Sequence, residues 1–315
     1  MVAILTLTLN PALDLAARAS RLRPMHKIRL SGEHFDPGGG GVNVARVAHR
    51  LGVPVRALLL AGGPTGALIG ELLAAEGVPF ETVPIPAPSR IAFNVHEDET
   101  GLEYRFVPAG PTIGEETASA LLDRARRSDA VFTVASGSLP PGLPPDTYAR
   151  FARELARAGR RFVLDTSGPA LTAAAAEGGM ALLKLSLSEL ESLAGAPLTA
   201  GPAVTAAARA LLERGVAEEV VVSLGSEGAL FVSAHETLTT PAFPVTATST
   251  VGAGDSFLAG FLTARLEGQP PAAALRFANA AGAAAVSAFG TARLDRAAVE
   301  AFLRSPPPSV PPPPA

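Results

Sequence analysis

Short apolar strands alternate with helices along most of this 315-residue chain, and glycines mark many of the junctions. Strands are predicted at residues 2–9, 55–60, 130–134, 162–164, 180–183 and 220–224. Helices are predicted at residues 42–51, 67–76, 146–158, 188–194, 203–214 and 257–266. Strands that alternate with helices of this length form βαβ units. We therefore expect an α/β fold around a central, mostly parallel sheet flanked by helices.

One segment follows a different period. Residues 90–95 and 102–107 alternate strictly between apolar and polar side chains, with a polar turn between them. Pairing Val95 with Leu102 places the apolar side chains on one face. It also makes Arg90 and Arg105 diagonal neighbours, about 7–8 Å apart, on the polar face. This hairpin is either an anion clamp or a solvated polar surface. Residues 27–30 also alternate and are predicted to extend the small sheet.

Charge and composition exclude several classes of function. The chain has 26 basic and 29 acidic residues and a net charge of −3, so it lacks the basic excess of a general nucleic-acid binder. The absence of cysteine excludes disulfides, thiolate metal sites and a cysteine nucleophile. Neither a membrane span nor a signal peptide is expected, and the cytoplasm is the predicted location.

Lysine is rare among the basic residues. Only Lys27 and Lys184 are lysines, and all the others are arginines. Lysines that remain in a chain so biased towards arginine are expected where a compact ammonium group is needed. The alternative is that two surface lysines have been retained by chance.

The most informative local motif is the glycine-rich segment 250–256, which precedes an apolar helix. Amides at the start of a helix bind anions, and Gly252 and Gly254 let the backbone approach a phosphate closely. Asp255 is either an acid that the helix dipole favours or a base that deprotonates a hydroxyl attacking a phosphate. The chain has no Walker A motif, no dinucleotide-binding fingerprint and no serine-hydrolase elbow.

These motifs resemble those of the PfkB, or ribokinase-like, family of carbohydrate kinases. The resemblance extends from Thr6 to about Leu294 and rests on residues 8–14, 38–47, 136–142, 165–168, 223–228 and 251–255. It is greatest to the phosphosugar branch. Gly40 is typical of the minor, PfkB-type 6-phosphofructokinases, whereas 1-phosphofructokinases and tagatose-6-phosphate kinases usually have lysine there.

The resemblance implies a ribokinase-like kinase domain at residues 1–304. A small β-sheet lid is expected from about residues 11–35 and 88–109. Residues 305–315, with seven prolines, are predicted to be an extended or disordered tail.

The resemblance also assigns a role to each motif residue. Asp255 is the implied catalytic base, and Gly252, Ala253 and Gly254 form the implied anion hole. The implied sugar-phosphate contacts are Asp14, Lys27, Gly38, Gly39, Gly40, Gly41, Asn43, Arg90, Arg105 and Ser138. The implied nucleotide contacts are Lys184, Ser186, Ser223, Gly225, Glu227, Gly228, Thr248, Thr250 and Asn279. Glu189 is expected to bind Mg²⁺ through water, and Ser186 replaces an asparagine that is common in the family.

Together these features predict a cytoplasmic kinase that uses MgATP to convert fructose 6-phosphate to fructose 1,6-bisphosphate in glycolysis. A monovalent cation is a further candidate cofactor. The alternative within the class is a 1-phosphofructokinase or tagatose-6-phosphate kinase, and the alternative from another class is a non-catalytic sugar-phosphate sensor. The expected partners are ATP, a hexose phosphate and a second copy of the chain bound through the lid, with no nucleic acid or membrane.

Overall fold

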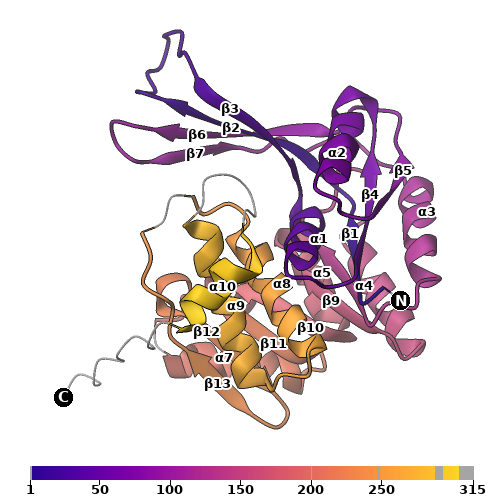
Figure 1. Ribbon diagram of the computed structural model, residues 1–315. Helices are drawn as coiled ribbons and strands as arrows, with labels where there is room; N and C mark the ends of the chain where they lie inside the picture. Colours follow the sequence, from indigo (N-terminus) through magenta and orange to yellow (C-terminus); the bar gives the residue numbers. More distant parts are fainter. Residues whose placement is uncertain (1, 200, 247–248, 288–293, 305–315) are drawn as a thin grey trace.

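The structure is a computed structural model that describes residues 2–199, 201–246, 249–287 and 294–304. Within these ranges the chain forms a main body around a large sheet and a small sheet that projects from it (Figure 1). The predicted tail, residues 305–315, lies outside the described residues. None of the helices in the described ranges has both the length and the apolar character needed to cross a membrane.

The main sheet has nine strands in the order β13-β12-β11-β10-β9-β8-β1-β4-β5. They are β1 (Ile4–Thr8), β4 (Val55–Ala61), β5 (Phe80–Pro84), β8 (Phe132–Ser136), β9 (Arg161–Asp165), β10 (Met180–Ser186), β11 (Ala217–Ser223), β12 (Ala229–Ser233) and β13 (Thr237–Thr240). All pairings are parallel except those of β12 with β11 and with β13. The parallel strands therefore end at one edge, where β8, β9 and β10 bring together Ser136, Asp165 and Ser186.

Helices cover both faces of the main sheet and create two apolar cores. One face carries α1 (Gly40–Arg50), α2 (Gly63–Ala75), α8 (Ala253–Leu266), α9 (Pro271–Val286) and α10 (Arg296–Arg304). The other carries α3 (Glu115–Arg126), α4 (Thr147–Arg157), α5 (Gly168–Glu177), α6 (Leu187–Ala194) and α7 (Gly201–Glu213). Strand β1 serves both cores, because Ile4 faces one helical layer while Leu5 and Leu7 face the other.

The small sheet has four strands in the order β3-β2-β6-β7. They are β2 (Ala12–Ala19), β3 (Ser31–Gly38), β6 (Arg90–Glu97) and β7 (Glu103–Phe106). The expected α/β fold, with a mostly parallel central sheet and a small additional sheet, is thus confirmed. The prediction of a strand at residues 27–30 is wrong: β2 ends at Ala19, so that segment has no strand beside it to pair with.

The hairpin of β6 and β7 has a different register from the predicted one. Val95 pairs with Tyr104 rather than with Leu102. The cause is a shorter turn: the Glu97 amide donates to the Leu102 carbonyl at 2.9 Å, and Gly101 (φ 70°) closes the turn. A shift of two residues leaves each side chain on its predicted face, so the alternation of apolar and polar residues could not exclude it.

A buried arginine joins the small sheet to the main body. Arg46 of α1 is fully buried, and its guanidinium donates to Asp36 of β3 at 3.1 Å and to Glu76 at 2.5 Å. The same group donates to the carbonyl of Pro37 at 3.1 Å. Burying a guanidinium is favourable only when its donors are paired in this way. Arg46 therefore fixes the base of the small sheet against the helix that follows the glycine segment.

Candidate active site

Asp255 lies in the first turn of α8, where residues from three elements meet. Its Oδ2 accepts a hydrogen bond from Asn43 Nδ2 of α1 at 2.9 Å. Its Oδ1 accepts one from Ser136 Oγ, at the end of β8, at 3.2 Å. These two bonds orient the carboxylate in space, which is what a positioned base requires.

The surroundings of Asp255 change its proton affinity. Burial raises the pKa of Asp255 above that of an ordinary carboxyl group. The hydrogen bond from Asn43, the charge of Lys184, the hydrogen bond from Ser136 and the charge of Arg105 oppose this shift without cancelling it. A carboxylate with a raised pKa is a stronger base, so the shift favours proton abstraction near neutral pH.

The loop before Asp255, residues 250–254, was predicted to bind an anion and is termed the anion-binding loop below. Gly252 is the N-cap of α8 and has φ 75°, the left-handed region that favours glycine. At Gly254 an added Cβ would lie 2.8 Å from Lys184 Nζ. The amides of this turn therefore lie beside a lysine ammonium group, and both attract negative charge.

Lys184 lies in a cluster that contains more acidic than basic groups. Its ammonium is buried on β10 and donates to Asp165, at the end of β9, at 3.1 Å and 3.2 Å. Burial alone would lower the pKa of Lys184, but the carboxylates of Asp165, Asp255 and Glu189 outweigh it and raise that pKa. Burial, together with the charges of Asp255 and Glu189, raises the pKa of Asp165 to about 6, against the opposing charge of Lys184. The three carboxylates therefore leave a net negative charge around the ammonium group, which would attract a further cation.

Ser186 organises Glu189 at the start of α6. Its hydroxyl accepts from the amide of Glu189 at 3.3 Å, while the Glu189 carboxylate accepts from the amide of Ser186 at 2.7 Å. This reciprocal arrangement is a capping box. The serine thus holds the glutamate in place, although it lacks the amide group of the asparagine that is common in the family.

The glycine segment allows close approach between the main body and the small sheet. A Cβ at Gly38 would overlap the carboxylate of Asp14, and a Cβ at Gly41 would lie 2.6 Å from the carbonyl oxygen of Leu7. Gly39 has φ 105°, a conformation that other residues rarely adopt. A Cβ at Gly40 would overlap Ser136 Oγ, which donates to Asp255. A side chain at position 40 would therefore displace the serine that holds the candidate base.

The two arginines of the predicted clamp are not diagonal neighbours. Arg105 lies opposite Asn94, four residues from Arg90, because of the shifted register. Arg90 instead donates to the carbonyl oxygens of Pro108 at 2.8 Å and Asn10 at 2.9 Å. Its buried Nε has no hydrogen-bond partner within the described ranges. Burial lowers the pKa of Arg90, and the charge of Asp14 opposes this shift.

Two other predicted sugar-phosphate residues lie in different places. Ser138 accepts a hydrogen bond from Asn10 Nδ2 at 3.3 Å, so it lies beside the short link between β1 and β2. Lys27 is exposed in the connection between β2 and β3. Within a single chain, Lys27 therefore lies in the loop that joins two strands of the small sheet.

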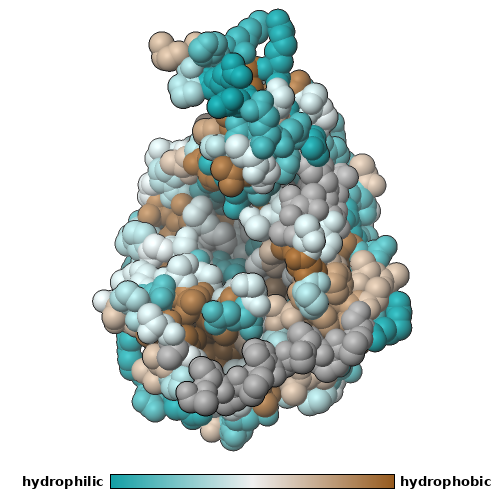
Figure 2. All heavy atoms as spheres, turned by 90° about the vertical axis from the view of Figure 1, so that its left-hand side faces the viewer, coloured by the Kyte–Doolittle hydropathy of each residue, from teal (hydrophilic) through white to brown (hydrophobic). Residues whose placement is uncertain are grey.

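A cavity of about 660 Å³ begins beside the anion-binding loop. It is lined by five of the predicted nucleotide residues, Ser223, Gly225, Gly228, Thr250 and Asn279, and by Ala253 and Gly254 of the predicted anion hole. Asn279 donates to the carbonyls of Thr240 and Pro241 at 3.3 Å and 3.1 Å, which closes one wall. Glu227 belongs to the neighbouring 3₁₀ turn but does not line the cavity, and Thr248 lies outside the described residues. Figure 2 shows the surface hollowed between the small sheet at the top and the main body below.

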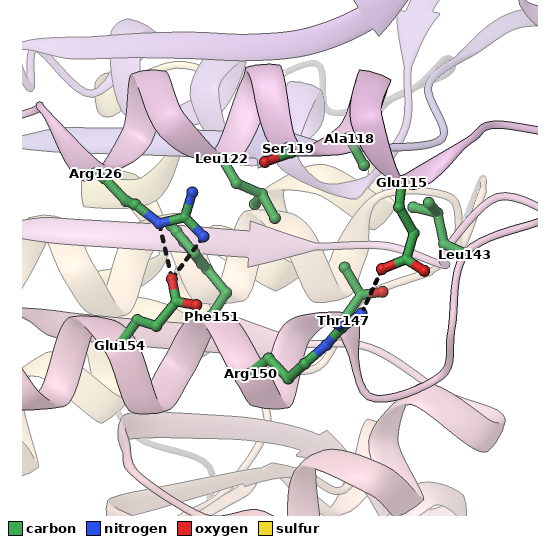
Figure 3. A pocket seen from close by; sticks show the side chains of 10 residues that line it. All are labelled: Glu115, Ala118, Ser119, Leu122, Arg126, Leu143, Thr147, Arg150, Phe151 and Glu154. Atoms are coloured by element: carbon green, nitrogen blue, oxygen red, sulfur yellow. Dashed lines mark hydrogen bonds and ion pairs between the residues drawn. The ribbon is translucent and has the colours of Figure 1, made fainter.

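A second hollow, between α3 and α4, has no comparable chemistry (Figure 3). Its volume is about 110 Å³. Arg150 pairs with Glu115 at 3.1 Å, and Arg126 pairs with Glu154 at 2.6 Å, so these charges satisfy one another. The cavity beside Asp255 is the stronger candidate for ligand binding.

Three residues of the site were quoted within motifs but received no role from the sequence. Ser136 holds Asp255, Asp165 pairs with Lys184, and Asn10 contacts Ser138. The signal for Ser136 and Asp165 was their position at the ends of parallel strands, where functional residues of α/β folds gather. In the described residues no group of three or more histidine or acidic side chains forms a metal site by itself.

Comparison with known proteins identifies the family of the chain. Residues 7–297 match the pfkB family carbohydrate kinases. The chain is 44% identical to ATP-dependent 6-phosphofructokinase isozyme 2 of Mycobacterium tuberculosis, covering 95% of this chain and 88% of the relative. It is 38% identical to the isozyme 2 of Escherichia coli, covering 92% and 94%. The crystal structure of Escherichia coli phosphofructokinase-2 in complex with fructose-6-phosphate superposes with a TM-score of 0.88 at 37% identity, covering 96% and 98%. The chain belongs to the pfkB family of carbohydrate kinases.

Proposed function

We propose that this chain is an ATP-dependent 6-phosphofructokinase, which converts fructose 6-phosphate to fructose 1,6-bisphosphate. The observation that carries the proposal is the position of Asp255, a buried carboxylate held by Asn43 and Ser136 directly after an amide loop that suits a phosphoryl group. A sugar hydroxyl at the carboxylate and a phosphate at the loop would be adjacent. The names of the relatives at 44% and 38% identity support fructose 6-phosphate as the acceptor.

The proposed reaction is an in-line phosphoryl transfer. The sugar hydroxyl oxygen bonds to the γ-phosphorus of ATP while the bond from that phosphorus to the β,γ-bridging oxygen breaks, and ADP leaves. Asp255 takes the hydroxyl proton and becomes a neutral carboxyl group. The amides of residues 252–254 stabilise the charge of the transferring group, and the nearby Lys184 ammonium adds to this effect.

The acidic cluster around Lys184 fits the Mg²⁺ of MgATP. Mg²⁺ usually keeps several waters and binds through one or two carboxylates together with substrate phosphates. We assign Asp165 and Glu189 as the residues that hold it, with Glu189 acting through water. The bound ion would neutralise phosphate charge. A monovalent cation is a further candidate, because Escherichia coli phosphofructokinase-2 has been crystallised with potassium.

Two features favour a sugar orientation with the C1 hydroxyl at Asp255. The positive charges of Arg90 and Arg105 suit a phosphate at the small sheet, and Gly40 leaves no lysine beside the sugar. Asn43 Oδ1 is buried without a partner in the described ranges, so it can accept a hydrogen bond from a sugar hydroxyl. A 1-phosphofructokinase or tagatose-6-phosphate kinase is the alternative; a relative named 1-phosphofructokinase matches at 34% identity, and one named D-tagatose-1-phosphate kinase matches at 33%.

A substrate panel with purified protein tests this proposal. We expect kcat/KM for fructose 6-phosphate to exceed that for fructose 1-phosphate by at least about tenfold, which is about 1.4 kcal/mol. Tagatose 6-phosphate is included as a less discriminating substrate. A preference for fructose 1-phosphate would move the chain to the alternative class.

Asp255→Asn separates a kinase from a non-catalytic sensor. The variant should bind both substrates, because asparagine is nearly isosteric, while turnover should fall by about 10²–10⁴. If the wild type binds the sugar phosphate but releases no ADP, the protein is a sensor. If the variant turns over within about threefold of wild type, Asp255 is not the base.

A second copy of the chain is the partner we assign to the outer face of the small sheet. Three phenylalanines form one row across the sheet: Leu15 pairs with Phe35 on one side and with Phe93 on the other, and Phe93 pairs with Phe106. Their exposed fractions are 40% for Phe35, 39% for Phe93 and 55% for Phe106. Such an apolar face requires a cover. A tetrameric inhibited form of Escherichia coli phosphofructokinase-2 has been crystallised, so a relative self-associates. Light scattering should give the mass of a dimer for the wild type and that of a monomer for Phe93→Asp.

The location in the cytoplasm and a role in glycolysis stay predictions.

A further inference from the structure

The small sheet touches the main body beside the anion-binding loop, through Glu103 and Ser249, to which no role has been assigned. Glu103 of β7 accepts a hydrogen bond from Ser249 Oγ at 2.8 Å and lies 3.5 Å from the amide nitrogen of Thr250. Ser249 Oγ in turn accepts a hydrogen bond from the amide of Val251 at 3.3 Å. A continuous series of hydrogen bonds thus connects a strand of the small sheet with the residue before Gly252, the N-cap of α8.

The position of Glu103 along β7 shows which face of the strand is turned towards the main body. Glu103 and Arg105 share one face of the strand, because side chains alternate. This face is turned towards the main body, since Glu103 contacts Ser249 and the charge of Arg105 acts on Asp255. Tyr104 lies on the opposite, outer face. The same strand therefore carries both the contact with the loop and a cation of the sugar-phosphate site.

Ser249 is a well-defined contact for the small sheet, to which it donates a hydrogen bond. It is 7% exposed, and its hydroxyl is used on both sides, as a donor to Glu103 and as an acceptor from Val251. Hydrogen bonds to a charged group in such a partly buried place are among the stronger ones. Loss of either partner would release the strand and the loop from each other.

We propose that Glu103 is a positioning residue that latches the small sheet to the anion-binding loop. This proposal rests on the proposed kinase function and deepens it. Glu103 does not touch the reacting atoms. It acts through Ser249: the latch keeps Arg105 on the face whose charge acts on Asp255, and it fixes the turn that presents the amides of residues 252–254. The latch thereby couples the position of the bound sugar phosphate to the conformation of the loop that binds the transferring phosphoryl group.

The kinetic test compares Glu103→Ala, Ser249→Ala and the double variant. Each single variant should lower kcat/KM for the sugar phosphate by about tenfold or more, the range expected for a hydrogen bond to a charged group. The double variant should lose no more than the worse single variant, because both break one contact. The dissociation constant of ADP should stay within about threefold of wild type, because ADP has no γ-phosphate to engage the loop.

Two further variants separate a latch from a general structural effect. Glu103→Gln keeps an acceptor oxygen for Ser249 and should retain most of the activity that Glu103→Ala loses. Glu99→Ala removes a carboxylate from the same hairpin and is the matched control. Glu99 pairs with Arg21 at 3.5 Å on the exposed surface, so its loss should leave kcat/KM unchanged.

Hydrogen exchange provides a readout that does not depend on the substrate. In protein without sugar, amides of residues 249–254 should exchange faster in Glu103→Ala and Ser249→Ala than in wild type or Glu99→Ala. This result would support the latch even if neither fructose phosphate proves to be a substrate, which would refute the proposed function alone. Unchanged exchange, activity within twofold of wild type, or a double variant whose loss is the product of the single losses would each overturn the latch.

Discussion

Gly40→Ala tests whether the glycine segment is built around the candidate base. The added methyl group would overlap Ser136 Oγ and would lie 2.8 Å from the backbone nitrogen of Gly137. Because the backbone cannot yield easily, Ser136 must move, and its hydrogen bond to Asp255 would be lost. The substitution therefore disturbs the base without touching it directly.

The size of the effect follows from that hydrogen bond. A hydrogen bond to a charged group contributes about 1.5–3 kcal/mol, so kcat should fall by about 10- to 150-fold. Overpacking should also lower the free energy of unfolding by about 1–3 kcal/mol. Ser136→Ala removes the same hydroxyl without the clash, so it should reproduce the fall in kcat with a smaller loss of stability.

Steady-state kinetics and urea unfolding measure both quantities. Gly201→Ala is the matched control, because nothing lies within 4 Å of a Cβ at that exposed position. It should leave kcat unchanged. A Gly40→Ala variant with kcat within threefold of wild type would refute the reasoning, since it would mean that Ser136 is not needed to hold Asp255.

Three further predictions concern the supporting residues. Arg46→Met removes the buried guanidinium that pairs with Asp36 and Glu76, so urea unfolding should show a loss of about 3–5 kcal/mol, and a loss below about 1 kcal/mol would contradict this. Ser186→Ala removes the cap of α6 and a hydrogen bond to Glu189, so the free energy of unfolding should fall by about 0.5–2 kcal/mol. The magnesium concentration needed for half-maximal activity should rise. An unchanged magnesium titration would argue against Glu189 as a ligand. The pKa of Asp165 is raised to about 6, mainly by burial, so the folded state takes up a proton before the unfolded chain does as the pH falls through that value. As the pH falls through about 6, the contribution of Asp165 to the free energy of unfolding should therefore increase, while the affinity for magnesium decreases. Asp165→Asn should show neither of these two changes.

The local pattern of the sequence predicted many elements of the main body, but not β5, β12, β13, α3, α5, α9 or α10. The helix after the glycine segment was expected to end near residue 51, and α1 ends at Arg50. The strand expected at residues 55–60 is Val55–Ala61. Such elements are predictable because apolar periodicity and glycine punctuation act over a few neighbouring residues.

The register of the small sheet was not determined by the same pattern. A hairpin shifted by two residues keeps the same apolar face, so alternation permits both pairings. The choice depends on the turn, where Gly101 and the buried carboxylate of Glu97, which accepts hydrogen bonds from Thr100 at 2.5 Å and from the amide of Leu22 at 2.5 Å, favour the shorter loop. That choice separates Arg105 from Arg90.

The sequence by itself determined which residue types are available for chemistry: an acid after a glycine-rich loop, two lysines among many arginines, and no cysteine. Only the tertiary structure decided what holds the acid. Ser136 lies 119 residues from Asp255 along the chain, and Asn43 lies 212 residues away. No local pattern encodes such distances. These residues meet because parallel strands end at one edge of the sheet. In addition, the glycines at positions 38–41 let the start of α1 approach that edge so closely that there is no room for a Cβ atom.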